Sequence, residues 1–439
     1  MDSYTLEAGS ILRVDGPATV RVITGRIYVL GVEYGVNDRI TIMRGRRVII
    51  KTLEKSTLEL IIGPEGNAEL ANEEDQLINQ WETTLNSIVS RGSTYVILGA
   101  MDVGKTTITT ILVNKGVARK LKVGVIDGDP GQNDIGPPTT VSSAVATNYI
   151  THLSQLKMDK SVFVKTTSVE HVWRDVINGI TKLRNDLLNR HGVDMVVINT
   201  DGWVSGEDAI NYKLELIRSV GATHVIILRR NNETDELIER VRGEFKNVYV
   251  LPSPPNARIR DREDRKIRRE MGYGRYIMPP RELSLSLRRT PIVNMPILHG
   301  SIYDNNMLRI IRKSLGPISY MEQWGGVAIA VGHVKEAQFR NIGGVTVLLL
   351  PNDWERGLLV ALEDRDNYLL TLGVLRRIYY SNGKAVIAVP RTFDREGEIH
   401  HIRLGMVRLN ENFEEVEKAV YISRVESLLT AKPQTILNP

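Results

Sequence analysis

Residues 99–107 read Gly99-Ala100-Met101-Asp102-Val103-Gly104-Lys105-Thr106-Thr107 and fit the pattern G-x-x-x-x-G-K-[ST]. The apolar run 95–98 leads into this stretch and the apolar run 108–113 leads out of it, which predicts a loop between a strand and a helix. Gly99 and Gly104 allow the backbone to turn so that successive N–H groups face phosphate oxygens. The N-terminus of the following helix adds a positive dipole end. The stretch therefore predicts a nucleoside triphosphate site.

Side chains of the same loop complete this predicted site. Lys105 would reach the β- and γ-phosphates, and the Thr106 hydroxyl would ligate Mg²⁺. The expected cofactors are ATP (or GTP) and Mg²⁺. The other loop residues expected to line the nucleotide are Gly99, Asp102, Val103, Gly104 and Thr107.

Composition sets broad limits on the protein. The chain has 439 residues, which predicts two or three domains, and 42% of them are hydrophobic and 25% charged, as in ordinary globular proteins. It has 0 Cys, which excludes disulfides and cysteine metal sites and favours a reducing cytoplasm. No apolar run is long enough to cross a membrane. A net charge of +5 is compatible with a nucleic-acid partner but does not establish one.

The pattern of apolar residues predicts an α/β fold: a central P-loop NTPase parallel sheet flanked by helices, with a small all-β N-terminal domain and a β-rich C-terminal domain. Residues 1–68 show short alternating runs separated by turn formers, and residues 291–439 show longer runs and an Asn-Gly hairpin. Residues 69–290 form the P-loop domain, in which strand-like and helix-like runs alternate. Its strands are expected at 95–98, 122–126, 194–199, 223–228 and 247–251, with helices over 77–89 and near 170–190 and a Gly/Ser/Thr/Pro-rich connection over 128–147.

Two carboxylates follow the second predicted strand. Asp127 and Asp129 come at its carboxyl end, the edge of an open α/β sheet at which ligands bind. Such a carboxylate can hold Mg²⁺, directly or through water, or accept a proton from a nucleophile. The alternative is that one of the two only caps the turn Asp129-Pro130-Gly131.

The third predicted strand ends in Thr200-Asp201-Gly202-Trp203. An indole just beyond the carboxyl edge of a sheet could stack on a base, and the Thr200 hydroxyl and the Gly202 N–H could contact phosphate. The alternative, that Trp203 packs under a loop as a core residue, is about as well supported by these residues alone.

Arginines dominate residues 256–289, which follow Pro252-Ser253-Pro254-Pro255. A solvated charged helix is the usual origin of such a run. Guanidinium groups, however, bind phosphate bidentately, and a segment with a proline-rich hinge could close over a triphosphate as a lid. Arg260 lies on a neighbouring face of the helical stripe formed by Arg258, Arg262, Arg265 and Arg269.

Together these motifs resemble the polynucleotide 5′-hydroxyl kinases related to the eukaryotic pre-mRNA cleavage and tRNA-splicing kinase subunit, a group with archaeal and rRNA-processing members. The run from Asp127 to Gln132 resembles the family's Asp-x-Asp-x-Gly-Gln motif, and residues 200–203 resemble the Thr-x-Gly-Trp clasp that holds the RNA end. Residues 260–265 resemble its lid motif, with Arg260 and Arg265 in the phosphate-binding positions. The resemblance departs at Tyr276-Ile277, where the family often has an aromatic pair, and no motif identifies the C-terminal domain.

The resemblance implies an ATP-dependent kinase acting on the 5′-hydroxyl of RNA, with single-stranded DNA as a further candidate substrate. Asp129 would accept the hydroxyl proton, while Lys105, Mg²⁺, Arg260 and Arg265 would neutralise the transferring phosphoryl group. Gln132, Thr200, Gly202 and Trp203 would bind the RNA end, and RNA-processing proteins are candidate partners. Two other functions remain open: a nucleotide-bound scaffold without turnover, and a metabolic ATPase or GTPase switch that uses the same sheet without RNA. The latter is disfavoured because Asn232-Glu233-Thr234-Asp235 lacks the lysine of a guanine-reading motif.

Overall fold

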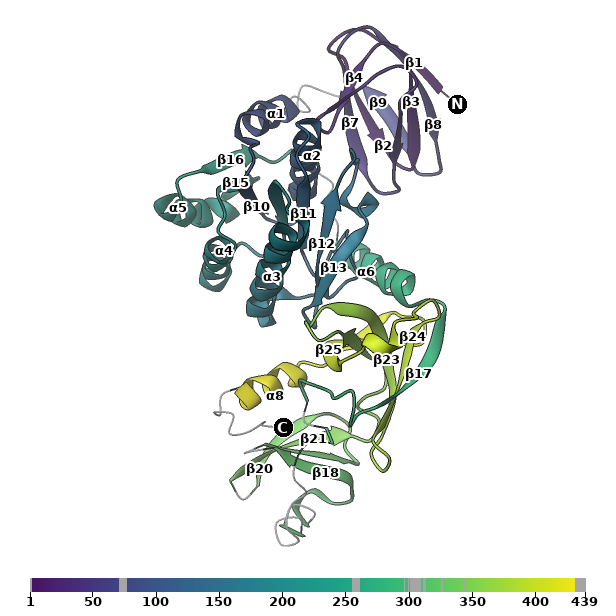
Figure 1. Cartoon of the computed structure of the whole chain (residues 1–439), viewed down its shortest axis with the longest axis vertical. Helices are drawn as coiled ribbons and strands as arrows, with labels where there is room; N and C mark the ends of the chain where they lie inside the picture. The colour runs from purple at the N-terminus through teal and green to yellow at the C-terminus, as the bar shows by residue number, and fades with distance from the viewer. Residues whose placement is uncertain are drawn as a thin grey trace. The chain divides into compact units, whose positions relative to one another are not determined.

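The computed structural model describes residues 2–70, 77–254, 261–295, 297–298, 300, 309–310, 313–324, 327–342 and 344–430 (Figure 1). The described residues fall into two units. The first includes those within 1–136, 141–161 and 173–261, and the second those within 137–140, 162–172 and 262–439. Each unit is described separately below. No helix in the described ranges is long and apolar enough to cross a membrane.

The first unit begins with two antiparallel sheets, ordered β1-β8-β3-β6 and β5-β4-β7-β2-β9. Their strands alternate buried and half-exposed residues because successive side chains point to opposite faces. The buried faces share one core, which includes Leu12, Val20, Ile50 and Leu58. The strands are β1 (Asp2–Leu6), β2 (Ile11–Asp15), β3 (Ala18–Thr24), β4 (Ile27–Val29), β5 (Val32–Tyr34), β6 (Arg39–Ile42), β7 (Arg47–Thr52), β8 (Ser56–Ile62) and β9 (Asn67–Leu70).

A central sheet ordered β13-β12-β11-β14-β10-β15-β16 follows. From β11 to β16 neighbouring strands are parallel, whereas β12 runs antiparallel to β11. Strands β10, β11 and β14 are buried along their whole length, as expected for strands covered by helices on both faces. The strands are β10 (Ser93–Gly99), β11 (Val123–Gly128), β12 (Thr140–Ala146), β13 (Met158–Phe163), β14 (Met195–Thr200), β15 (His224–Arg229) and β16 (Val248–Pro252).

Helices cover both faces of this sheet. The chain passes from β10 to β11 in one direction and then returns through β14, β15 and β16, so right-handed crossovers place α2 on one face and α3, α4 and α5 on the other. The packing agrees, since α1 contacts α2 whereas α4 contacts both α3 and α5. The helices are α1 (Leu77–Ile88), α2 (Lys105–Ala118), α3 (Trp173–His191), α4 (Glu207–Ser219) and α5 (Asp235–Glu244), with short 3₁₀ turns η2 (Leu153–Gln155), η3 (Val169–His171) and η4 (Asn232–Thr234).

The second unit contains the arginine-rich helix α6 (Arg262–Ile277) and two sheets, ordered β17-β24-β23-β22-β25-β26 and β18-β19-β21-β20. Tyr273 and Ile277 of α6 are buried in the core of the first of these sheets. Its remaining elements are β17 (Pro280–Ser286), β18 (Ile318–Trp324), β19 (Val327–Gly332), β20 (Gln338–Ile342), β21 (Val345–Pro351), β22 (Leu358–Glu363), β23 (Leu369–Tyr379), β24 (Lys384–Pro390), η5 (Glu396–Glu398), β25 (His401–Leu409), β26 (Glu415–Lys418) and α8 (Tyr421–Thr430).

The predicted fold class is confirmed: a P-loop sheet flanked by helices, with β-rich parts before and after it. Two details differ from the expectation. The connection 128–147 contains β12, an antiparallel strand that the Gly, Ser and Thr content did not indicate. The arginine-rich run 256–289 is not one element, because α6 ends at Ile277 and Pro280–Ser286 pairs with β24 as a strand. The three domain boundaries stay a prediction.

Candidate active site

The glycine-rich loop leaves the carboxyl end of β10 and enters α2 at Lys105. Gly99 has φ +146° and Gly104 has φ +105°, backbone conformations that favour glycine. A Cβ at Gly99 would lie 2.9 Å from the Leu228 carbonyl oxygen, and one at Gly104 would lie 3.1 Å from the Trp81 ring. The loop therefore needs glycine at both ends, for conformation and for space.

Loops from three neighbouring strands hold the glycine-rich loop in place. After β14, Gly202 approaches Met101 so closely that a Cβ would lie 2.8 Å from its backbone nitrogen. After β15, the Arg230 guanidinium donates to the Asp102 carbonyl. After β16, the Ser253 hydroxyl donates to the Val103 carbonyl over 3.0 Å. The loop is thus braced from outside its own segment.

Lys105 is buried within this loop. Its ammonium donates to the carbonyl oxygens of Gly99 at 2.9 Å and Ala100 at 2.6 Å. Burial lowers the pKa of Lys105 to about 8, although the Asp129 and Asp201 carboxylates act in the opposite direction. An ammonium held this way can exchange loop carbonyls for phosphate oxygens, as the predicted role of Lys105 requires.

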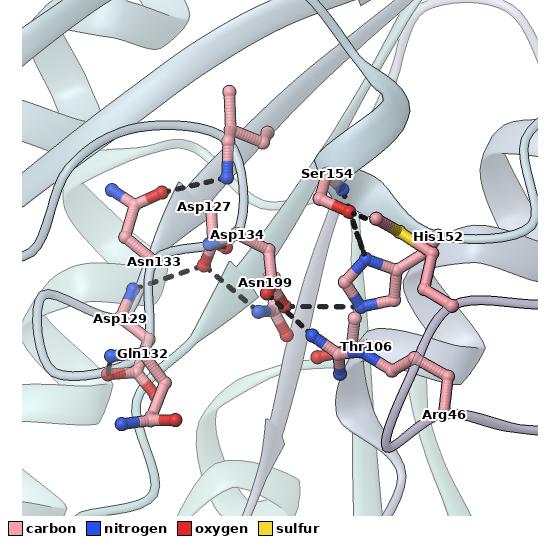
Figure 2. Close-up of polar contacts among 12 residues, drawn as sticks. Arg46, Thr106, Asp127, Asp129, Gln132, Asn133, Asp134, His152, Ser154 and Asn199 are labelled. Carbon is pink, nitrogen blue, oxygen red and sulfur yellow. Dashed lines mark hydrogen bonds and ion pairs between the residues drawn. The ribbon is translucent and has the colours of Figure 1, made fainter. Parts of the chain in front are cut away.

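Asp127 lies at the end of β11 and is fully buried. Its Oδ1 accepts the Asn199 side-chain amide at 3.0 Å and the Asp129 N–H at 3.3 Å, and its Oδ2 accepts the Asp134 N–H at 2.7 Å (Figure 2). Burial and the nearby Asp134 carboxylate raise the pKa of Asp127 to about 8. Three N–H groups thus donate to the carboxylate of Asp127, the predicted Mg²⁺ ligand, and two of these bonds hold the loop that follows β11.

Asp129 is half-buried and begins this loop. Its Oδ1 accepts the N–H groups of Gly131 at 2.9 Å and Gln132 at 3.0 Å. Burial and the Asp201 carboxylate raise the pKa of Asp129, whereas Lys105 and the two N–H donors oppose that rise. A carboxylate with a raised pKa is a better proton acceptor than an ordinary aspartate. The Gln132 side chain is half-buried and donates to the Gly131 carbonyl at 2.6 Å.

Thr200, the last residue of β14, is buried, and its hydroxyl donates to the Ile97 carbonyl at 2.7 Å, which joins β14 to β10. Its contact with phosphate stays a prediction. Trp203 is half-buried, and its ring stacks on Tyr212 with centroids 5.8 Å apart. Whether Trp203 stacks on a base or packs as a core residue stays a prediction.

A buried charge cluster behind Trp203 was missed from the sequence. Asp201 Oδ1 accepts the Trp203 N–H at 2.9 Å, and its Oδ2 accepts the Tyr212 hydroxyl at 2.7 Å and the Lys213 ammonium at 2.8 Å. Lys213 has no exposed surface, and burial lowers its pKa although Asp201 opposes the shift. The signal available in the sequence was a lysine within the apolar face of the helix over 207–219.

The lid arginines are only partly described. Arg260 lies outside the described residues, and Arg265 is a half-buried residue of α6 in the second unit. Arg269, on the predicted phosphate stripe, instead binds both carboxylate oxygens of Glu415 at 2.7 and 2.6 Å. The Glu415 N–H also donates to Glu270, so one face of α6 is fixed to the C-terminal strands.

Comparison with known proteins shows which proteins this chain is similar to. Residues 99–278 match the family model of the mRNA cleavage and polyadenylation factor CLP1 P-loop. A polyribonucleotide 5′-hydroxyl-kinase of Methanocaldococcus jannaschii is 27% identical over 73% of this chain and 88% of its own length. Another, of Thermococcus kodakarensis, is 25% identical over 76% of this chain and 93% of its own length. The resemblance noted in the sequence is confirmed.

Eukaryotic proteins match over a similar extent. The polyribonucleotide 5′-hydroxyl-kinase Clp1 of Xenopus laevis is 25% identical over 80% of this chain and 87% of its own length. The solved structure of Clp1p in complex with a segment of Pcf11p has a TM-score of 0.61 at 12% identity, and covers 93% of this chain and 97% of that chain. That likeness shows that the fold is shared.

Because the Lys105 ammonium is buried, this residue should lower the free energy of unfolding at pH 7. Because the pKa of Lys105 is about 8 in the folded chain and 10.5 as its ordinary value, the unfolded chain binds more protons between these pH values. Wild-type stability should then rise with pH across this window. At pH 7, Lys105→Met should raise the free energy of unfolding by about 1–3 kcal/mol, and the gain should vanish near pH 10.

Denaturant melts of nucleotide-free protein at pH 7 and pH 10 measure this difference. Lys157→Met, which removes an exposed lysine of the same unit, is the matched control and should change stability little at either pH. A Lys105→Met protein less stable than wild type at pH 7 would show that the loop carbonyls compensate the buried charge in full.

Proposed function

We propose that this chain, which carries the P-loop domain of the mRNA cleavage and polyadenylation factor CLP1 family over residues 99–278, is an ATP-dependent kinase that phosphorylates the 5′-hydroxyl of RNA. The observation that supports it most is the convergence of three groups at one sheet edge. Lys105, Asp129 and Trp203 follow β10, β11 and β14, which are adjacent parallel strands of the central sheet, and the Asp201 carboxylate accepts the Trp203 N–H at 2.9 Å. The relatives named polyribonucleotide 5′-hydroxyl-kinase support the choice of substrate.

Each group has a distinct task in this proposal. The N–H groups of residues 99–107 and the Lys105 ammonium bind the β- and γ-phosphates. Asp129 accepts the proton from the 5′-hydroxyl oxygen as that oxygen attacks the γ-phosphorus in line. Trp203 stacks on the terminal base, and Arg265, with Arg260, meets the charge on the transferring phosphoryl group. Catalysis then rests on positioning and electrostatics, as phosphoryl transfer requires.

The residues also fit a magnesium ion. Oxygen donors are the ligands Mg²⁺ prefers, and the Thr106 hydroxyl at the start of α2 and the carboxylates of Asp127 and Asp129 at the carboxyl end of β11 are such donors. Mg²⁺ keeps several waters, so carboxylates can hold it through water while Asp127 retains its N–H donors. When bound, the ion would neutralise phosphate charge; Thr106 and the two aspartates would hold it.

Single-stranded DNA is a second candidate substrate, because stacking on Trp203 does not read the sugar. GTP is a second candidate donor, since no guanine-specific motif is present to select or reject it. Clp1p has been crystallised with a segment of Pcf11p, so we propose RNA-processing protein partners for this chain as well. The cysteine-free composition supports a cytoplasmic location.

Label transfer tests the proposal directly. The chain is incubated with γ-labelled ATP, Mg²⁺ and 5′-hydroxyl oligonucleotides of RNA or DNA, and labelled product is measured. Label should appear on 5′-hydroxyl RNA and not on the same RNA already bearing a 5′-phosphate. Lys105→Ala should abolish transfer. Nucleotide binding without any label transfer would favour the scaffold function instead.

Asp129→Asn should bind ATP normally and lose about two to four decades of kcat, the usual contribution of a general base. Asn keeps an oxygen that can accept the two loop N–H groups, so the loop should persist. Asp186→Asn, which loses a carboxylate paired with Arg190 on α3, is the control and should retain full kcat. Single-turnover kinetics with saturating ATP measure both, and a near-normal rate for Asp129→Asn would exclude it as the base.

Trp203→Ala should raise the KM for oligonucleotide about 10–100-fold, because base stacking on an aromatic ring contributes about 1–3 kcal/mol. The loss should not depend on which base is terminal, and melting temperature should change little because the ring is half-buried. Trp173→Ala removes another tryptophan that packs on Tyr212, with centroids 6.3 Å apart, and serves as the control. An unchanged KM together with a large drop in melting temperature would assign Trp203 to packing.

Arg265→Ala should lower kcat more than it weakens ATP binding, since the charge it meets develops during transfer. Arg269→Ala is an informative comparison because Arg269 binds Glu415 within the second unit. It should lower melting temperature and leave kcat of the folded protein nearly unchanged. Equal losses of kcat and ATP affinity in Arg265→Ala would make Arg265 a ground-state nucleotide ligand only.

A further inference from the structure

An arginine of the N-terminal strands reaches the loop that carries Asp129. Arg46 lies between β6 and β7, and its Nη2 lies 2.8 Å from Asp134 Oδ1. The Asp134 side chain is 7% exposed and that of Arg46 is 19% exposed, so water screens this ion pair less than a surface pair. Both residues belong to the first unit.

Asp134 connects this arginine to the reacting end of the sheet. Its backbone N–H donates to Asp127 Oδ2 at 2.7 Å, and Asp127 Oδ1 in turn accepts the Asp129 N–H. Figure 2 shows Arg46 and His152 converging on Asp134 from one side, with Asp127 and Asn199 on the other. Asp134 is the last residue of the loop over 129–134, and its contacts hold that end of the loop. The first residue of the loop is the proposed base, Asp129.

His152 provides a second contact to the same carboxylate. Its Nδ1 accepts the Ser154 N–H at 3.1 Å, which leaves the proton of the neutral ring on Nε2. Nε2 lies 3.4 Å from Asp134 Oδ2. A neutral imidazole adds no positive charge, whereas the Arg46 guanidinium offsets the negative charge of Asp134.

The position of Arg46 is itself fixed. Its N–H donates to the Met43 carbonyl at 3.1 Å, and its carbonyl accepts the Gly16 N–H at 2.8 Å. A Cβ at Gly16 would lie 2.1 Å from the Met43 carbonyl oxygen, so the turn packs directly on that glycine. β6 and the turn after it also contact residues 151–154, through Thr151 Oγ1 to the Thr41 carbonyl and Ser154 Oγ to Met43 Sδ. These contacts hold the turn that carries Arg46 and so restrict the position of its guanidinium group.

We propose that Arg46 is a positioning residue for phosphoryl transfer: through Asp134 it anchors the loop over 129–134 and so fixes where the Asp129 carboxylate lies. This inference rests on the proposed kinase function. It gives the N-terminal strands a role in the chemical step that is exerted through the loop that carries Asp129. A misplacement of about 1 Å is enough to reduce a rate about 100-fold, so a modest loosening of this loop would be visible in kcat.

Four variants test the inference. Arg46→Met removes the guanidinium but keeps an unbranched side chain, and should lower kcat about 10–100-fold with the KM for RNA and the Kd for ATP changed less than threefold. Arg46→Lys, which keeps the charge, should recover part of that loss. Asp134→Asn keeps the backbone N–H to Asp127 and should match Arg46→Met. The double variant should be no slower than either single variant, since both remove one interaction.

Arg44→Met is the matched control. Arg44 lies two residues away in the same turn, and its pair with Glu65 is exposed, at 66% and 69% for the two side chains. Its removal should leave kcat, KM and backbone exchange unchanged. If Arg46→Met does not fold, Asp134→Asn carries the test, and a kcat within threefold of wild type in Asp134→Asn overturns the inference. A lower melting temperature with unchanged kcat also overturns it, because the pair would then be structural only.

Amide hydrogen exchange separates this inference from the kinase function. In nucleotide-free protein, exchange at residues 129–134 should be faster in Arg46→Met than in wild type and Arg44→Met. Equal exchange rates would overturn the anchoring whether or not the chain is a kinase. If wild type transfers no label to RNA, the proposed function fails. If wild type transfers label and Arg46→Met does so with the same kcat, this inference alone fails.

Discussion

The burial of charged side chains at one edge of the central sheet is the constraint on which the candidate site depends. Lys105 and Lys213 are buried close enough to Asp129 and Asp201 for each charge to shift the pKa values of others in the group. A buried charge is tolerated only when it is paired and hydrogen-bonded, and each of these groups has such partners. Their mutual compensation keeps ionisable groups in a low-dielectric environment, where electrostatic interactions are stronger than in water.

The glycine-rich loop is held in place by contacts from segments at the carboxyl edge of the central sheet. Gly202, Arg230 and Ser253, which follow three different strands, contact the loop. Trp81 of α1 packs beside Gly104, and its indole N–H donates to the Pro252 carbonyl at 2.8 Å. A loop held by its own residues alone would have to be ordered by the nucleotide, at the expense of binding energy. The parallel sheet avoids this because it brings the carboxyl ends of all these strands to one place.

Two arginines of helix α6 have different roles, one structural and one proposed to bind phosphate. Arg269 is used within its own unit, where its bidentate contact with Glu415 and the buried Tyr273 fix the helix to the C-terminal strands. Arg265 comes four residues earlier, about one turn away, so the anchored face and the proposed phosphate-binding arginine share one rigid element. An arginine-rich sequence therefore does not imply that every guanidinium serves the ligand.

The sequence by itself determined the glycine-rich loop and the alternation of strands and helices along the chain, because glycine spacing, apolar periodicity and turn chemistry are local. The predictions for Asp129 and Trp203 come from the same local patterns. Only the tertiary structure decided that the Thr200 hydroxyl turns inward, that Asp127 is occupied by three N–H donors, and that Lys213 and Arg46 stand behind the site. Apart from the two loop N–H groups that bind Asp127, these contacts join residues 12 to 103 positions apart, and their burial sets pKa values that no local pattern encodes.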